Sequence, residues 1–101
     1  MATAYLIEVP GVTQEQGSAI LRELGLSTPP AGQILHLEGP MEGGLRVVDV
    51  WESQAAFDRF IQERLVPAVQ RAGATFPATL QPKLTWPVSH VLTWPATPAL
   101  A

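Results

Sequence analysis

Two residues in the middle of the chain carry side chains that can accept, donate or hold a proton. His36 lies between Leu35 and Leu37 in an apolar run, and Asp49 lies inside the segment VVDVW. A neutral imidazole in a strand can accept a proton from a bound hydroxyl group. A half-buried carboxylate is costly unless it is paired. We therefore take His36 as a candidate base, and Asp49 as its partner or as a contact for a ligand hydroxyl.

Structural interpretations stand beside these chemical ones. The favoured interpretation of His36 is a strand histidine at a dimer interface or bonded to a backbone group, and that of Asp49 is half of a salt bridge. His90, near the end of the chain, has the same two interpretations as His36. The aromatic residues either wall a pocket for an aromatic ligand or fill the core; they are Tyr5, Trp51, Phe57, Phe60 and Trp86.

Composition excludes several other classes of function. The chain has 101 residues, 47% hydrophobic and 15% charged, which fits one compact domain, expected over residues 1–94, with a flexible tail at 95–101. Its net charge of -3 and scattered basic residues argue against nucleic-acid binding. No apolar run approaches about 20 residues and the start does not resemble a signal peptide, so we expect a cytoplasmic protein without membrane contact.

Motifs for other chemistries are missing from the sequence. There is no cysteine, no paired-histidine spacing for a metal, no phosphate-binding glycine loop and no nucleophile elbow. We therefore expect neither a metal nor a cofactor.

The elements that must position the candidate residues follow from local signals. Strands are predicted at 5–9, 33–38, 45–51 and 84–92, the last with Pro87 at an edge position or a bulge. A helix is predicted at 14–24, with Thr13 and Gln16 as a capping box and Gly25 after its end. A second helix follows the N-cap Ser53, with a kink or break at Pro67, and closes at Gly73.

The resulting order βαββαβ predicts a ferredoxin-like α+β fold, a four-stranded antiparallel sheet with two helices on one face. The other face is then an apolar surface, which predicts a homodimer packed sheet to sheet.

The register of the hairpin between residues 33 and 51 decides whether His36 and Asp49 meet. If Glu38 pairs with Arg46, His36 lies beside Val48 and away from Asp49. If Glu38 faces Leu45 instead, then His36, Asp49 and Trp51 line one surface. The charge pair favours the first register, by at most about 1 kcal/mol.

Three segments carry a resemblance to a known family: GQILHLEG, GGLRVVDVWES and AFDRFIQERLVPA. They resemble the dimeric α/β-barrel superfamily, specifically small proteins related to the antibiotic biosynthesis monooxygenase domain. Characterised relatives include cofactor-independent oxygenases of phenols and quinols and haem-degrading enzymes, with a cavity between sheet and helices. Their site often combines an asparagine, a tryptophan and a histidine. Here Trp51 matches, asparagine is absent and Phe60 stands where the histidine is expected, which argues against haem degradation.

The resemblance implies a cofactor-independent monooxygenase-like protein that acts on or binds a small aromatic or polyketide-like molecule. As an enzyme it would be a cofactor-free oxygenase or isomerase, in which His36 and Asp49 would be catalytic and the five aromatic residues named above, with His90, would contact the substrate. The alternative is a non-catalytic ligand-binding or structural homodimer.

Overall fold

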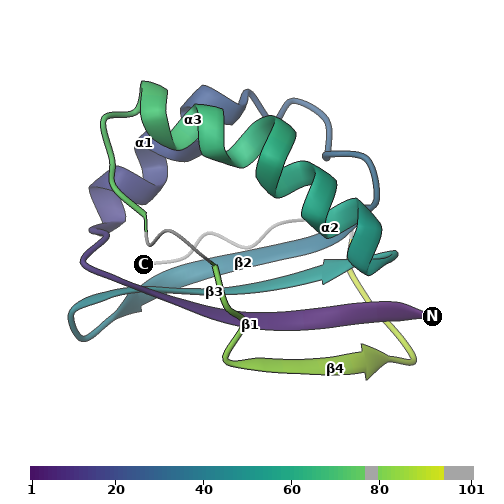
Figure 1. Ribbon diagram of the computed structural model, residues 1–101. Helices are drawn as coiled ribbons and strands as arrows, with labels where there is room; N and C mark the ends of the chain where they lie inside the picture. Colours follow the sequence, from purple (N-terminus) through teal and green to yellow (C-terminus); the bar gives the residue numbers. More distant parts are fainter. Residues whose placement is uncertain (77–79, 95–101) are drawn as a thin grey trace.

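The computed structural model describes residues 1–76 and 80–94 of the chain. Within these residues four strands form one antiparallel sheet in the order β2-β3-β1-β4. They are β1 (Ala2–Pro10), β2 (Gln33–Met41), β3 (Gly44–Trp51) and β4 (Leu84–Val88). All the helical segments cover the same face of this sheet (Figure 1). The predicted ferredoxin-like α+β fold is therefore confirmed.

The first helix, α1 (Gln14–Leu24), has the predicted bounds because its end signals are local. The Thr13 hydroxyl accepts the Gln16 N–H at 3.1 Å, and the Gln16 side chain accepts the Thr13 N–H at 2.9 Å. Gly25 ends the helix with a φ of 63°, in the left-handed region that favours glycine.

The second helical segment consists of α2 (Gln54–Phe60), a π-helical turn η1 (Ile61–Leu65) and α3 (Val66–Arg71). Ser53 caps it as predicted, accepting the Ala56 N–H at 3.1 Å. The predicted kink or break at Pro67 is replaced by this wider turn, in which the Val66 N–H bonds to the Ile61 carbonyl. Pro67 has no N–H, and its ring crowds the carbonyl four residues earlier, so widening the preceding turn keeps the chain helical.

The register between β2 and β3 differs from the one that the sequence favoured, in which Glu38 pairs with Arg46. Glu38 lies opposite Val47, and His36 lies directly opposite Asp49. The two-residue turn between Met41 and Gly44, with a φ of 77° at Gly43, sets this pairing. Arg46 finds its partner elsewhere, because its guanidinium lies 3.3 Å from the carboxylate of Glu8 on β1. Both registers considered from the sequence are therefore wrong, because Glu38 faces neither Arg46 nor Leu45. His36, Asp49 and Trp51 nevertheless lie on one surface, as in the alternative that was not favoured.

The last strand is shorter than predicted. β4 ends at Val88, so His90 and Leu92 lie beyond it. Pro87 is on an edge strand, as expected for a residue without an N–H. The tail predicted at 95–101 lies outside the described residues. Among the described residues, no helix is long and apolar enough to cross a membrane.

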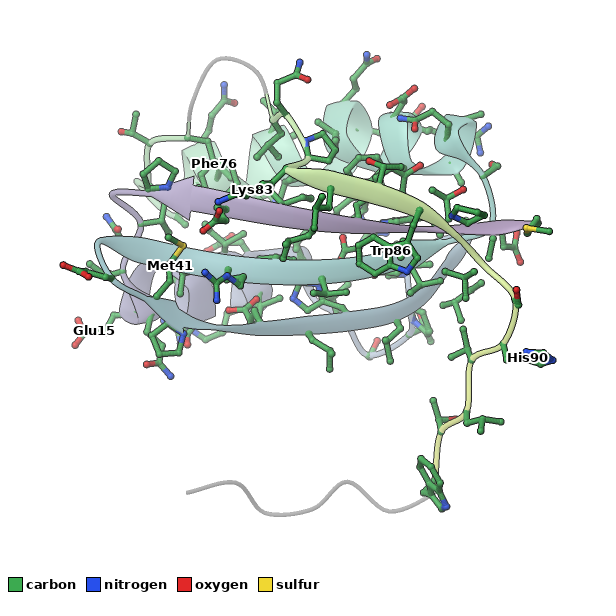
Figure 2. The ribbon with its side chains drawn as sticks, turned by 90° about the horizontal axis from the view of Figure 1, so that it is seen from below. Glu15, Met41, Phe76, Lys83, Trp86 and His90 are labelled. Atoms are coloured by element: carbon green, nitrogen blue, oxygen red, sulfur yellow. The ribbon has the colours of Figure 1, made fainter. Side chains whose placement is uncertain are left out.

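The two faces of the sheet have different surroundings. Tyr5, Asp49 and His36 form one row across β1, β3 and β2 on the face covered by the helices. The opposite face carries no helix, and Trp86 lies on it (Figure 2). Its exposed apolar side chains are Leu37, Leu84 and Trp86, with partly buried Leu6, Leu35 and Val48 between them. We call this surface the open face.

At Gly44, strand β3 lies so close to β1 that a side chain has no room. A Cβ at this position would collide with the carbonyl oxygen of Val9 and lie 2.9 Å from Cα of Pro10, both backbone atoms. We expect Gly44→Ala to lower the free energy of unfolding by about 1 to 3 kcal/mol, measured by urea denaturation. Gly39→Ala on β2 is the control, because a Cβ there has no neighbour within 4 Å. Equal losses in the two variants would contradict this account.

Candidate functional site

His36 lies between two carboxylates on the helix-covered face of the sheet. Its Nδ1 is 2.6 Å from Oδ1 of Asp49, and its Nε2 is 2.8 Å from Oε1 of Glu38. The first contact follows from the β2–β3 register, and the second from strand alternation, which places residues two apart on one face. Both ring nitrogens therefore donate hydrogen bonds when the ring is protonated.

Trp51 fixes the orientation of Asp49. Its indole Nε1–H donates to Oδ2 of Asp49 at 3.2 Å, and the whole residue is 0% exposed. Asp49 is itself buried, so its two oxygens are held by His36 on one side and Trp51 on the other. Such pairing is what a buried carboxylate requires.

The two carboxylates keep His36 charged. The hydrogen bond to Asp49, followed by the one to Glu38, raises the pKa of His36 to about 9, while partial burial opposes the shift. At neutral pH the ring is an imidazolium. This differs from the neutral imidazole that the sequence analysis considered, because Glu38 was not expected to contact it.

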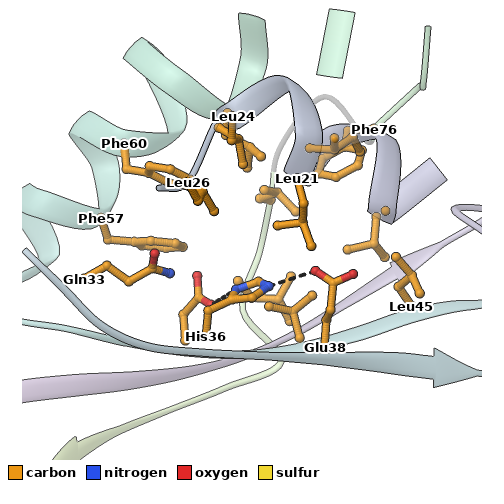
Figure 3. A pocket seen from close by; sticks show the side chains of 18 residues that line it. Leu21, Leu24, Leu26, Gln33, His36, Glu38, Leu45, Phe57, Phe60 and Phe76 are labelled. Atoms are coloured by element: carbon orange, nitrogen blue, oxygen red, sulfur yellow. Dashed lines mark hydrogen bonds and ion pairs between the residues drawn. The ribbon is translucent and has the colours of Figure 1, made fainter. Parts of the chain in front are cut away.

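A cavity of about 80 Å³ lies between this group and the helices (Figure 3). Its polar lining lies along the sheet side of the cavity and consists of Gln33, His36, Glu38 and Asp49, all from the hairpin β2–β3. Apolar side chains form the remaining wall. They are Ile7, Val9, Ile20, Leu21, Leu24, Leu26, Leu45, Val47, Phe57, Phe60, Leu65, Phe76 and Leu80, with Gly17 completing the lining. No lysine or arginine is among these lining residues, so His36 supplies their positive charge.

The structure brings together four of the residues that the sequence singled out. His36, Asp49, Phe57 and Phe60 line the cavity. Tyr5 does not line it; it is buried and stacks on Phe57, with ring centroids 4.3 Å apart.

The other three predicted residues are arranged differently. Trp51 packs behind Phe60 at a centroid distance of 5.0 Å and reaches the site through Asp49. Trp86 is on the open face, on the other side of the sheet from the cavity. His90 is exposed beyond the end of β4 (Figure 2). Neither Trp86 nor His90 is among the lining residues.

Glu38 and Gln33 are site residues that the sequence analysis missed. Glu38 was considered there only as a partner for Arg46. The alternation of β2 already places it on the face of His36, so the signal was present. Gln33 gave no such signal, because the β-bulge between Gln33 and Leu35 interrupts the alternation.

Comparison with known proteins supports the fold. No family model and no curated protein matches the sequence. Among solved structures, protein YJCS from structural genomics has a TM-score of 0.61 at 10% identity, over 88% of this chain and 100% of that one. A putative antibiotic biosynthesis monooxygenase from Chloroflexus aurantiacus has a TM-score of 0.56 at 15% identity, over 90% and 97%.

A third neighbour has an activity in its name. SnoaB, a cofactor-independent oxygenase from Streptomyces nogalater, aligns with a TM-score of 0.53 at 17% identity, over 90% of this chain and 94% of that one. At these identities the likeness establishes the fold. The chain therefore has the ferredoxin-like fold of antibiotic biosynthesis monooxygenase proteins, as the sequence resemblance implied.

The charge of His36 predicts how stability depends on pH. The pKa of the folded state, about 9, lies above the ordinary value of 6.5, so the folded state holds this proton more tightly. The contribution is complete below about pH 6.5 and is lost as the pH rises to about 9. We expect a loss of about 1 to 2 kcal/mol in the free energy of unfolding across this window, because the partly exposed side chain is screened by solvent.

Urea denaturation at a series of pH values measures this loss. His36→Gln should flatten the curve between pH 6.5 and 9, whereas His90→Gln should leave it unchanged, because His90 is exposed and outside the site. A slope that survives in His36→Gln would assign the effect to another group.

Proposed function

We propose that the protein binds a small aromatic molecule in the cavity between sheet and helices, and oxygenates it without a cofactor. The observation that carries this proposal is an apolar cavity whose sheet side carries a few polar groups around His36 and Asp49. Binding sites for small molecules commonly combine an apolar wall with a few convergent polar groups and a perturbed pKa. The fold shared with monooxygenase proteins agrees with it.

The volume of the cavity limits the size of the ligand. About 80 Å³ exceeds the space of a single water, but it is well below the roughly 150 Å³ of a cavity that binds benzene, so even a ligand with one ring requires the lining to move. Phe57 and Phe60 offer ring faces and edges for stacking. Leu26, Phe76 and Leu80 come from connecting segments, so they are the lining residues that can move without disturbing the sheet.

His36 would act on the ligand as a positively charged hydrogen-bond donor. An imidazolium beside a phenolic oxygen stabilises the negative charge that forms when the hydroxyl loses its proton to water. An ionised phenol is rich in electrons and transfers them to dioxygen more readily than the neutral form. One oxygen atom would enter the ring of the ligand and the other would leave as water, with the electrons supplied by the ligand, as in the conversion of a hydroquinone to a hydroxyquinone. In this scheme Asp49 holds the histidine ring in place, and Trp51 holds Asp49.

The second candidate function is ligand binding without catalysis. It is favoured by the contacts of His36, whose two nitrogens are both already paired with carboxylates. A ring in this state has no free lone pair with which to remove a proton from a substrate.

We also propose that the protein is a homodimer, with the open face as its interface. Leu37 and Leu84 are 55% and 57% exposed there, and Trp86 is 42% exposed. A second copy would cover this apolar surface as the helices cover the other face.

Binding and oxygenation are tested separately with hydroquinone. We expect the NMR signals of Phe57 and Phe60 to shift on its addition, and His36→Gln to weaken binding by about tenfold, because a hydrogen bond to a charged group is lost. An oxygen electrode then measures consumption above spontaneous oxidation. Glu42→Gln, in the exposed turn, is the control. Binding without oxygen consumption favours the second candidate function, and absence of binding contradicts both.

The dimer is tested by sedimentation equilibrium. We expect twice the subunit mass for the natural chain and a weakening of association by about a hundredfold in Leu37→Glu, which buries a charge in the interface. Val66→Glu is the matched control, because Val66 is 46% exposed on α3, away from the open face. A natural chain that is monomeric at all concentrations would contradict the proposed interface.

A further inference from the structure

Glu38 occupies the position from which His36 would contact a ligand. Asp49 holds Nδ1 from the buried side, so Nε2 is the ring nitrogen that points along the cavity toward Glu38 (Figure 3). The carboxylate of Glu38 forms a hydrogen bond with this nitrogen at 2.8 Å. A ligand oxygen that bonds to Nε2 must therefore replace it.

We propose that Glu38 is a built-in competitor for the ligand, and that the cavity binds an aromatic molecule with an anionic group, best a carboxylate, which displaces Glu38 from His36. This inference rests on the ligand-binding part of the proposed function, since it specifies the ligand of the same cavity, and a carboxylate on His36 takes the place of the phenolic oxygen in the oxygenation scheme. It also goes beyond that function, because it gives Glu38 the role of a specificity-determining residue.

The balance of charge in the cavity favours an anion. Asp49 and Glu38 contribute two negative charges and His36 one positive charge, and within residues 1–76 and 80–94 no other charged residue lines the cavity. When an anion replaces Glu38, the charge facing His36 is unchanged. When a neutral molecule replaces it, His36 loses the second of its two counter-ions in an apolar cavity, which is unfavourable.

The surroundings of the Glu38 carboxylate favour a ligand carboxylate in its place. Oε1 of Glu38 lies on Nε2 of His36, and Oε2 lies beside Gly17 of α1, only 3.0 Å from where a Cβ at Gly17 would be. The missing side chain at Gly17 thus leaves space that the second oxygen shares with Leu45, whose Cδ1 lies 2.6 Å from the same position. A ligand carboxylate would place one oxygen on His36 and the other in this space.

The position of Glu38 in the sheet allows it to leave. It is on β2, an edge strand, and its side chain is 20% exposed. Rotation about its side-chain bonds therefore carries the carboxylate toward water, where it is well solvated. Asp49, by contrast, is buried on the central strand β3 and is bonded to Trp51, so it stays with His36.

The test compares benzoate with its neutral isostere benzamide by isothermal titration calorimetry. Removing the competitor should raise the population of open cavity, so Glu38→Gln should bind benzoate about tenfold more tightly than the natural chain. Benzamide should gain clearly less than benzoate, because it shares the freed space but, being neutral, gains nothing from the loss of repulsion by the displaced Glu38 carboxylate. Gln has the shape of Glu, so the fold is retained. Glu42→Gln, which removes the same charge in the β2–β3 turn, should match the natural chain for both compounds.

Two outcomes would overturn the inference alone. Weaker benzoate binding in Glu38→Gln would mean that Glu38 assists the ligand, and an equal gain for benzamide would mean that only space, not charge, has been released. Both leave the proposed aromatic site intact. If neither compound binds any variant, while hydroquinone binds, the inference again fails alone. If none of the three binds, the proposed function fails with it.

A 4-nitrophenol titration distinguishes the two kinds of anion. Its colour reports ionisation, so a bound phenolate is seen directly in the absorbance spectrum. Tight benzoate binding without a colour change in Glu38→Gln supports the carboxylate. A colour change with no gain for benzoate would overturn that assignment in favour of an ionised hydroxyl group.

Discussion

The hydrogen bond between His36 and Asp49 depends on the register of one hairpin. A shift of one residue between β2 and β3 would turn the side chain of His36 to the open face and leave the buried Asp49 with the Trp51 N–H but without its cationic partner. The short turn at Glu42 and Gly43 fixes the register at one end. The pairing of β3 with β1 then places Asp49 opposite Tyr5, in the middle of the sheet. The polar lining of the cavity and the positive charge of His36 beside Asp49 both follow from this alignment.

In the site, a single residue, Trp51, takes part in both apolar packing and polar hydrogen bonding. Trp51 belongs to the core through Phe57 and Phe60, and its N–H also completes the bonding of Asp49. One residue thus joins the apolar cluster to the charged one. The helices contribute apolar side chains to the cavity, while the sheet contributes the polar ones. Sequence changes in the helices therefore alter the shape of the cavity and leave its charge unchanged.

The sequence was most informative where the determinant is local. The bounds of α1 follow from Thr13, Gln16 and Gly25, which are close together in the chain, and the cap at Ser53 is equally local. The register of β2 and β3 was predicted wrongly because the Glu38–Arg46 pair was weighed above the turn, and Arg46 pairs with Glu8 on a third strand. Such competition between partners cannot be read from one hairpin. The π turn before Pro67 is similar, since the proline disfavours a regular helix without specifying how the chain adapts.

The burial of Trp51 has a further consequence for studying this protein. The chain has three tryptophans, and Trp86 and Trp94 are 42% and 76% exposed, whereas Trp51 is enclosed and bonded to Asp49. An indole shielded from water emits at shorter wavelengths than an exposed one, and a neighbouring charge shifts its emission. The fluorescence of Trp51 is therefore an intrinsic optical signal of the protonation state next to it, readable without attaching any label.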